Sequence, residues 1–567
     1  MSFNSKPTAP YLLKQTSKSR ILFIKKNSFL SLFSLLFLLL LPFFSIAQDE
    51  TKKGMDERIN DWFKPLADWW GGIIFFPITI GGFAIPFVVI LLISGALFFT
   101  IYFTFVNIRR FGLAVRVVRG KYDYLDKDAP HIKPPEDMPA DTEGDLLGTI
   151  KDEGHHGEVN HFQALATAVS GTVGLGNIAG VAIAIALGGP GATFWMIICG
   201  LLGMSTKFVE CTLGVKYRDI DSKGTVYGGP MYYLRRGFAE RNMAGVGKVL
   251  GVLFAIFCIG GSFGGGNAFQ SNQAAAQIIG MTGFEGGNAG FIIGLALAFF
   301  VGIVIIGGIK RIAQVTEKIV PFMAGIYVLA SLIIIFGHFT LIDDAIGQIF
   351  SQAFTPTAAV GGFIGVLVRG FQRAVFSNEA GAGSAAIAHS AVRTRYPASE
   401  GLVSLLEPFI DTVVICTMTA VVIIIYNMNG AHFEYGNVAD TSTAAGVGLT
   451  SAAYNDVIPH FSYVLTIAIV LFAFSTMISW SYYGLQSWKF LFGRSKTSDL
   501  SYKVLFLAFV VIGASASLGA VIDFSDAMIF AMVFPNMIGL FFLFPKVKEE
   551  LNKYLKAIKN NKAPAVK

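Results

Sequence analysis

Long apolar stretches separated by short polar loops make up most of this chain, and this pattern predicts a bundle of membrane-spanning helices. A helix needs about 20 apolar residues to cross the hydrocarbon core of a bilayer. The first such stretch covers residues 83–106. Further stretches lie near residues 161–187, 191–215, 248–279, 290–308, 316–338, 361–390, 402–426, 460–484, 501–521 and 526–545. We therefore expect an all-α polytopic membrane protein with about 11 spans in its mature chain.

Two of these apolar stretches contain glycines and small polar residues near their middle. The first break runs from Ala168 to Gly180, and the second runs from Val375 to Ser384. In hydrocarbon an unpaired backbone amide costs several kcal/mol, so irregular backbone persists there only where it lines a cavity. Paired breaks in the two halves of a membrane protein indicate the binding site of a transporter.

The spacing of the two breaks predicts an internal repeat. Asn378 follows Asn177 by 201 residues, with five spans from the first broken helix to the one before the second. Because five is odd, the two broken helices cross the membrane in opposite directions. We expect a 5+5 inverted repeat with halves at 161–338 and 361–545, joined by an outer loop at 339–360. The helix at 83–108 is then an additional N-terminal span.

The charges of the loops predict the orientation. Lys and Arg are absent from the predicted outer loops at 280–289, 339–360, 427–459 and 522–525. The predicted inner loops contain Lys216, Arg218, Arg235, Arg236, Lys310, Arg311, Arg393, Arg395, Lys489 and Arg494. Since Lys and Arg concentrate on the cytoplasmic side, we expect a cytoplasmic linker at 109–160 and a cytoplasmic tail at 546–567.

The N-terminus has the features of a secretory signal at residues 1–47. Basic residues precede the apolar run from Phe29 to Phe44, and Ser45-Ile46-Ala47 offers a small-residue cleavage site. An uncleaved signal anchor is the alternative. In either case residues 48–82 lie outside, where Trp62, Trp69 and Trp70 indicate an interfacial segment.

Composition supports the membrane class. The chain has 567 residues, of which 53% are hydrophobic and 14% charged, whereas soluble domains carry about 25% charged residues. The net charge of +7 lies in short loops and termini, which argues against nucleic acid as a partner. The four cysteines lie in apolar segments and fit no metal or disulfide spacing. We find no His-Glu-x-x-His, Gly-x-Ser-x-Gly or Walker motif, which argues against an enzyme and a bound cofactor.

The first break has three interpretations. A dinucleotide-binding loop would need a βαβ unit around it, which an apolar helix does not provide. Gly176 and Gly180 could instead form a helix-packing face. Ser170, Thr172 and Asn177 favour an unwound binding site, because packing does not require these polar groups. The half-helix that starts near Asn177 would then direct its N-terminal amides at an anionic group.

Glu379 in the second break is an acid at membrane depth, where ionisable residues are costly and usually functional. A direct role and a structural hydrogen bond both remain open for it. Arg369 and Arg373 on the preceding half-helix could pair with Glu379 or Asp411, or extend toward the membrane surface.

Three further polar groups occur in or beside the apolar segments. The hydroxyls of Ser475, Thr476 and Ser479 could bond back to their own helix or bind a small cation such as Na⁺. An amide cluster, which could link helices, comprises Asn267, Gln270, Asn272 and Gln273. His155, His156 and His161 at the end of the linker fit solvated loop histidines better than a metal site.

Five motifs together resemble the alanine or glycine:cation symporter family. They are Asn177-Ile-Ala-Gly-Val, Gly188-Gly-Pro-Gly-Ala, Gly229-Pro-Met-Tyr-Tyr, Val375-Phe-Ser-Asn-Glu-Ala-Gly and Trp480-Ser-Tyr-Tyr-Gly. The resemblance covers about residues 83–545. It implies the LeuT-like inverted-repeat fold of the APC superfamily and coupling to Na⁺, with H⁺ as the second choice.

The resemblance also implies roles for individual residues. The carbonyls of Ser170 and Val173 and the hydroxyls of Ser475 and Thr476 would hold one Na⁺. The residues around the amino acid would be Gly174, Gly176, Asn177, Gln270, Phe376, Ser377 and Trp480. From the residues themselves, we expect gating or structural roles for Glu379, Arg373, Asn378 and Asn267.

We therefore expect a sodium-coupled carrier that takes up a small neutral amino acid such as alanine or glycine. Its partners would be that amino acid, Na⁺ and membrane lipid, with Na⁺ as coupling ion in place of a cofactor. We expect it in the bacterial plasma membrane, with the mature N-terminus outside and the C-terminus in the cytoplasm. The alternatives are a proton-coupled carrier that uses Glu379, a channel or a membrane enzyme.

Overall fold

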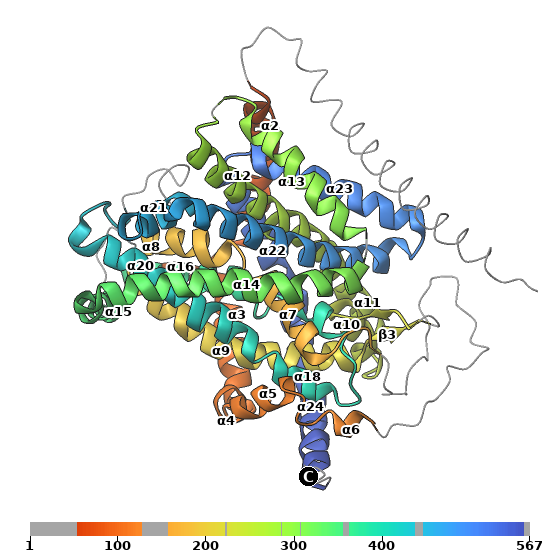
Figure 1. The fold of residues 1–567 in the computed structure, drawn as a ribbon. Helices are drawn as coiled ribbons and strands as arrows, with labels where there is room; N and C mark the ends of the chain where they lie inside the picture. Colours follow the sequence, from red (N-terminus) through yellow and green to blue (C-terminus); the bar gives the residue numbers. More distant parts are fainter. Residues whose placement is uncertain are drawn as a thin grey trace, which may run out of the picture.

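The computed structural model describes residues 54–127, 157–221, 224–284, 286–306, 308–354, 362–436 and 446–560. The predicted signal at 1–47 lies outside these residues, as does the part of the predicted linker from 128 to 156. The described residues are mostly helical, and long helices pack side by side through the centre of the molecule (Figure 1).

Every predicted span contains helix. The unbroken helices are α3 (Phe87–Tyr102), α9 (Gly191–Lys216), α13 (Ala289–Ile305), α14 (Gly308–Gly337), α22 (Phe461–Phe492), α23 (Lys496–Ser515) and α24 (Leu518–Asn560). In the described part of the chain, seven continuous helical segments are long and apolar enough to cross a membrane; they include Ala244–Thr282 and Pro397–Tyr426, whereas α3 and α13 are shorter apolar helices. The bent pair His161–Thr172 and Gly176–Gly188 could form an eighth span. The count of 11 spans and the inverted repeat remain predictions.

Four spans are built from shorter pieces. The first consists of α7 (His161–Thr172), the π-helix η2 (Gly176–Gly180) and α8 (Val181–Gly188). The second consists of α11 (Ala244–Phe263), the π-helix η3 (Gly264–Ala268) and α12 (Phe269–Thr282). The third pairs α16 (Gly362–Asn378) with α17 (Ala385–His389). The fourth consists of α18 (Pro397–Val403), α19 (Leu406–Pro408), the π-helix η6 (Phe409–Cys416) and α20 (Thr417–Tyr426).

The predicted interfacial segment and the start of the additional span form a helix and a hairpin. Helix α2 (Met55–Ile74) exposes Trp62 and Trp69. Strand β1 (Pro77–Ile80) pairs antiparallel with β2 (Phe83–Pro86), with Pro77 opposite Pro86. Gly81 and Gly82 join the strands with φ of 59° and 87°, as a tight two-residue turn requires. Helix α3 therefore begins at Phe87, not at residue 83 as predicted.

Helix α2 is fastened to the start of α13. The Met55 amide donates to Asn288 Oδ1 at 2.9 Å, and the Asp56 carboxylate accepts from the amides of Gly290 and Phe291 at 3.1 and 3.0 Å. A carboxylate at a helix N-terminus is favoured by the helix dipole. Burial nevertheless raises the pKa of Asp56 above its usual value, while these backbone hydrogen bonds lower it.

The last helix is longer than the sequence predicts. The residues at 522–525 form no loop, because α24 runs without interruption from Leu518 and continues through 546–560 of the predicted tail. The preceding turn lies at Ala516 and Ser517, and the Ser517 amide donates to Asn60 Oδ1 at 2.9 Å. Residues 522–525 contain neither Gly nor Pro, so nothing in them ends the helix.

Short elements occupy the connections between spans. Between α3 and α7 they are α4 (Val106–Arg109), α5 (Phe111–Val118) and α6 (Tyr124–Lys127), and between α9 and α11 they are β3 (Asp219–Ile220), β4 (Val226–Tyr227) and α10 (Pro230–Ala239). In the predicted outer loops they are η4 (Phe339–Leu341), α15 (Ile342–Phe354), η7 (Met428–Gly430) and α21 (Val447–Val457).

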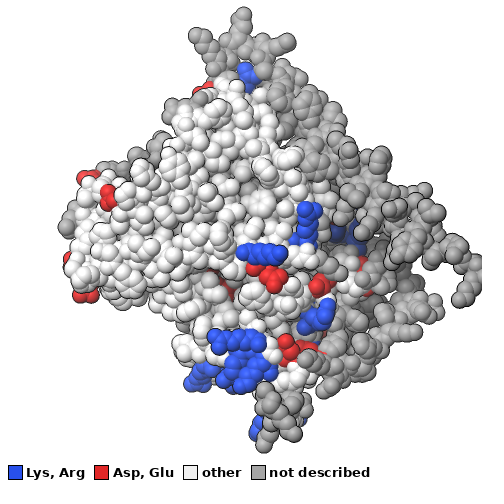
Figure 2. All heavy atoms as spheres, viewed as in Figure 1, with Lys and Arg blue, Asp and Glu red and all other residues white. Residues whose placement is uncertain are grey.

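Figure 2 shows how charge is distributed on one face of the molecule. Lys and Arg gather over its lower part, where Figure 1 places α4, α5 and α24. Only acidic residues appear at the left edge, where α15 carries Asp343 and Asp344. This separation is consistent with the predicted orientation, which itself remains a prediction.

We expect Gly513→Ala to destabilise the fold. A Cβ at Gly513 would overlap the backbone of Ala268 and lie 2.6 Å from Ser271 Oγ. Overpacking of this kind costs about 1–3 kcal/mol. Thermal unfolding of the purified protein in detergent measures the effect. Gly325→Ala is the matched control, because no atom lies within 4 Å of its added Cβ; equal stability of the two variants would contradict the expectation.

Candidate functional site

The first break frees backbone amides that point at side-chain oxygens. Helix α7 ends at Thr172, and the chain resumes as η2 after a 51° bend. The Gly174 amide donates to Asn177 Oδ1 at 2.9 Å, and the Leu175 amide donates to Gln270 Oε1 at 3.0 Å. Gly176 lies against Ser377 of the second break, where an added Cβ would be 3.3 Å from the Ser377 Cα. The two adjacent amides of Gly174 and Leu175 thus hold oxygen acceptors inside the bundle.

Oxygen atoms from α7 and α22 meet beside this break. The Thr476 hydroxyl donates to the Ser170 carbonyl at 3.0 Å, and the Ser170 hydroxyl donates to the Ser475 carbonyl at 2.9 Å. The Ser479 hydroxyl donates to Ser170 Oγ at 3.0 Å. All four residues are buried. We call these oxygen atoms the α7–α22 oxygen cluster.

The other two predicted ion ligands, Ser475 and Val173, make contacts that differ from those of Ser170 and Thr476. The Ser475 hydroxyl bonds back to the Phe472 carbonyl of its own helix at 3.0 Å, so Ser475 contributes its carbonyl to the cluster instead. Val173 is buried at the end of α7, where its amide donates to the Val169 carbonyl at 2.7 Å. Ser479, which the sequence offered as a possible cation ligand but the resemblance did not include, lies one turn from Ser475 and joins this cluster.

The second break turns through left-handed backbone. Helix α16 ends at Asn378, and Glu379, Gly381 and Gly383 have φ of 57°, 94° and 87°. Side chains satisfy the amides that the break leaves free. Asn378 Oδ1 accepts from Ala380 at 2.9 Å, and Glu210 Oε1 accepts from Gly381 at 2.9 Å. The Asn378 amide group also donates to Thr412 Oγ1 at 2.9 Å.

Glu379 ties the second break to α22. Its Oε1 accepts from the Trp480 indole N–H at 2.9 Å, and its Oε2 accepts from the Ser384 hydroxyl. Trp480 is 1% exposed, and its ring packs where a Cβ of Gly266 would stand. This geometry matches the structural hydrogen bond that the sequence left open for Glu379.

Asp411 connects the two breaks. Its Oδ1 accepts from Asn177 Nδ2 at 2.6 Å and from Ser377 Oγ at 3.1 Å, and its Oδ2 accepts from Thr412 Oγ1 at 2.7 Å. Asp411, Asn177 and Ser377 are all 0–1% exposed. The sequence predicts for Asp411 only a pairing with an arginine, although an acid within an apolar stretch is itself a functional signal.

Three π-helical segments in the described part of the chain lie around this site. Segment η2 carries Asn177, η3 carries Asn267 and η6 carries Asp411. Segment η2 contacts η6, and η3 contacts α22. π-Helical turns often occur at functional sites, because they displace side chains from a regular helix.

Arg373 pairs differently from the prediction. Its guanidinium bonds Asp526 on α24 and lies 5.1 Å from the centre of the Phe376 ring, so its ion pair is neither with Glu379 nor with Asp411. Phe376 in turn packs edge-on against Phe269, with ring centres 5.0 Å apart. Asp526 was overlooked because it begins the last predicted span and resembles a loop acid.

The predicted amide cluster has both structural and site contacts. Asn267 Nδ2 donates to the Phe506 carbonyl at 2.6 Å and so links η3 to α23. Gln270 reaches from α12 to the Leu175 amide and to the Gly265 carbonyl. Asn272 bonds the Gly513 carbonyl at 3.0 Å, as expected for interhelical links.

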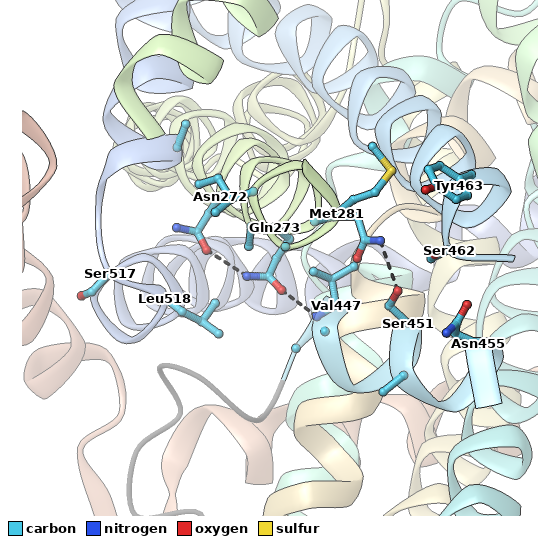
Figure 3. A pocket seen from close by; sticks show the side chains of 18 of the residues that line it. Asn272, Gln273, Met281, Val447, Ser451, Asn455, Ser462, Tyr463, Ser517 and Leu518 are labelled. Atoms are coloured by element: carbon cyan, nitrogen blue, oxygen red, sulfur yellow. Dashed lines mark hydrogen bonds between the residues drawn. The ribbon is translucent and has the colours of Figure 1, made fainter. Parts of the chain in front are cut away.

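A cavity of about 670 Å³, on the predicted outer side, adjoins the amide cluster (Figure 3). Gln273 Oε1 accepts there from the Val447 amide at 2.9 Å, and the Gln277 amide donates to Ser451 Oγ at 3.2 Å. Gln270, Gln273 and Gln277 recur at helical spacing on α12. A polar stripe therefore connects this cavity with the first break.

His161 is not the solvated loop histidine that the sequence favoured. It begins α7, is 8% exposed and bonds the Glu400 carboxylate. His155 and His156 lie outside the described residues. The described residues contain no group of three or more His, Cys, Asp or Glu side chains that could hold a metal ion.

This architecture defines a class of protein. Apolar helices interrupted near their middle, with irregular backbone turned toward buried polar groups, are typical of secondary transporters. A family model described as the sodium:alanine symporter family matches residues 144–567. The chain therefore belongs to the sodium:alanine symporter family.

Two sequence relatives support the family assignment. The sodium/alanine symporter AgcS of Methanococcus maripaludis is 38% identical over 84% of this chain and 95% of its own length. The probable sodium/glutamine symporter GlnT of Bacillus subtilis is 33% identical over 84% of this chain and 89% of its own length. Among solved structures, the crystal structure of MhsT with L-phenylalanine has a TM-score of 0.46 at 14% identity, covering 70% of this chain and 100% of that one. The sequence matches identify a multi-pass membrane transporter for sodium-coupled amino-acid symport, not an enzyme.

We expect Gly174→Ala to abolish most sodium-driven amino-acid uptake. An added Cβ would overlap Thr476 Oγ1 and lie 3.1 Å from Gln270 Oε1, so it would disturb both the oxygen cluster and the amide contact. Uptake into proteoliposomes, normalised to folded protein, measures the effect. Gly180→Ala in the same break is the control, because no atom lies within 4 Å of its added Cβ. Similar uptake by both variants would refute the assigned importance of this close approach.

Proposed function

We propose that this protein takes up a small neutral amino acid, such as alanine or glycine, together with Na⁺. The observation that carries the proposal is the meeting of the two breaks at Asp411, beside the α7–α22 oxygen cluster. An amino-acid zwitterion needs acceptors, donors and a small enclosed volume in one place. The residues around Asn177, Ser377 and Ser170 supply the polar groups close to each other.

The substrate carboxylate would bind the amides of Gly174 and Leu175. These amides now donate to the side-chain oxygens of Asn177 and Gln270. An ionised carboxylate accepts stronger hydrogen bonds than a neutral amide oxygen, so it can replace the Gln270 oxygen. The start of a half-helix adds a favourable dipole for the negative charge.

The rest of the pocket would select for a small amino acid without net charge. The substrate ammonium group would meet backbone carbonyls near Phe376, and Ser377 would line the same side. Trp480, held by Glu379, would close the pocket together with the Phe376 ring. Arg373 is committed to Asp526, which fits its assignment as a gating or structural residue.

Na⁺ would occupy the α7–α22 oxygen cluster. The Ser170 carbonyl and the hydroxyls of Thr476 and Ser479 are hard oxygen ligands of the kind such a cation prefers. The Val173 carbonyl and Ser475 remain members of the proposed ligand set. These ligands carry no formal charge, so the transported ion keeps its charge and a transport cycle should be electrogenic. Each positive charge that moves inward gains about 2.3 kcal/mol per 100 mV.

Alternating access would come from rocking of one group of helices against another around this site. We propose the LeuT-like 5+5 inverted repeat with one additional N-terminal helix as its framework, with the C-terminus in the cytoplasm. The proton-coupled alternative has one specific observation in its favour, which is the buried carboxyl of Glu379 beside Trp480.

We expect Ser479→Ala to weaken Na⁺ binding. The variant removes one hydroxyl from the oxygen cluster, and a loss of about 1.4 kcal/mol would raise the Na⁺ concentration for half-maximal uptake about tenfold. Ser481→Ala is the matched control, because Ser481 is buried in the same helix but bonds only back to the Ile478 carbonyl among its described contacts. Equal Na⁺ dependence of the two variants would remove Ser479 from the ion site.

We expect counterflow of labelled alanine or glycine in proteoliposomes that is saturable and requires Na⁺. A panel of unlabelled amino acids, including serine and glutamine, ranks the substrates by competition. Flux without counterflow would indicate a channel. Uptake that follows a pH gradient without Na⁺, and is lost in Glu379→Gln, would establish the proton-coupled alternative instead.

A further inference from the structure

A second buried polar assembly shares no residue with the proposed substrate and ion site. His161, Glu400, His389, Glu407 and Lys207 follow one another through direct contacts, and we call them the His161–Lys207 chain. They come from α7, α18, α17, α19 and α9 respectively. His161 is 8% exposed, and the other four are 0% exposed. Among them only His161 stands out in the sequence, and the proposed transport mechanism uses none of the five.

The contacts are continuous from one end to the other. Glu400 accepts from His161 Nδ1 on one oxygen and faces His389 Nδ1 at 2.6 Å with the other. His389 Nε2 lies 3.4 Å from Glu407 Oε2. The other oxygen of Glu407 accepts from Lys207 Nζ at 3.1 Å. Each member therefore contacts the next without a gap.

The position of His389 implies a bound proton. Both nitrogens of its ring face carboxylate oxygens, and a neutral imidazole has only one N–H to donate. Either the ring is a cation, or one of the two carboxyls is protonated. One exchangeable proton thus lies on this bridge in either form. With Lys207 charged, that proton also balances the two carboxylates Glu400 and Glu407.

Burying five ionisable side chains costs free energy, which indicates a functional role for them. Buried ion pairs contribute little net stability compared with apolar packing. Ionisable groups inside membrane proteins usually mark ion or proton pathways. Through Glu400, the His161–Lys207 chain joins α7, which precedes the first break, to α17, which follows the second.

The His161 end of the His161–Lys207 chain reaches a cavity. His161 lines a hollow of about 900 Å³ together with Asp123, Asp126, Glu158 and Arg393. These residues belong to the predicted linker and inner loops, so this cavity is on the predicted cytoplasmic side. His161 is the member of the chain through which protons from that cavity would enter or leave.

Other charged groups surround the chain. Arg218 donates to the carbonyls of Ser390, Val392 and Thr394 and interacts electrostatically with Glu400 and Asp126. The carboxyl groups of Asp123 and Asp126 interact electrostatically with His161. At the other end, Lys207 interacts electrostatically with Glu210, Glu379 and Cys211. Glu407 interacts in the same way with Tyr483 of α22.

We propose that the His161–Lys207 chain is a proton-binding site that exchanges with the cytoplasm when the cytoplasmic side of the protein opens. Opening that separates α7 from α18 would break the His161–Glu400 contact and bring water to His389. An imidazole in water is half-protonated near pH 6.5, so the proton would leave at neutral or alkaline pH. Retention of the proton favours the closed arrangement, and acid inside would therefore slow opening.

The experiment measures sodium-driven alanine uptake in proteoliposomes with external pH and the Na⁺ gradient held constant. Because this readout rests on the proposed function, it is paired with a second one. We expect uptake to fall about fivefold as internal pH is lowered from about 8 to about 6. His389→Gln should keep uptake but lose this dependence. His338→Gln, at the predicted outer surface, should keep both.

Uptake by the unchanged protein that ignores internal pH would overturn the proposal, as would full pH dependence in His389→Gln. If His389→Gln does not fold, His161→Gln takes its place; it can still bond Glu400, and a pH profile identical to that of the unchanged protein would count against the proposal.

The second readout is NMR of the ring-¹⁵N-labelled histidines in the purified full-length protein. A His389 signal that changes with pH supports the proton site even if no amino acid is transported, in which case only the proposed function fails. A His389 signal that stays fixed from about pH 5 to about pH 8 overturns the proton site.

Discussion

The need to satisfy every buried backbone amide governs this structure. Two spans lose their regular helix in the middle, and in a membrane the freed amides must find partners within the protein. Gly174 and Leu175 find them in Asn177 and Gln270, and Gly381 finds one in Glu210. The side chains that stabilise the breaks are thus the ones that gather polar groups in the core, and the site is a consequence of this requirement.

Much of the helical pattern could be predicted from the sequence, because apolar length and loop charge are local properties. Every predicted span contains helix, and the first break and the family were identified from quoted residues. The errors occurred where a pairing depends on distant segments. Arg373 pairs with Asp526 and not with Glu379, and His161 pairs with Glu400. Helix packing, which sequence spacing does not reveal, determines these partners.

The contacts within the candidate site were only partly predictable from the sequence. Ser170 and Thr476 meet as the resemblance implied, whereas the Ser475 hydroxyl turns back to its own helix. Which of two neighbouring hydroxyls faces a partner helix depends on the rotation of α22, and an apolar helix without strong amphipathicity gives no signal for that rotation. Asp411 was underestimated for a different reason, since its role requires both breaks to be present at once.

The attachment of α2 has a consequence for motion. Its residues bond the start of α13 through Asp56 and the turn before α24 through Asn60, and it packs along α24. Helix ends that are tied to one common strut cannot separate from one another without breaking those bonds. The ends of α13, α23 and α24 on that side are therefore held to one another through α2, and any movement that separates them must break these hydrogen bonds.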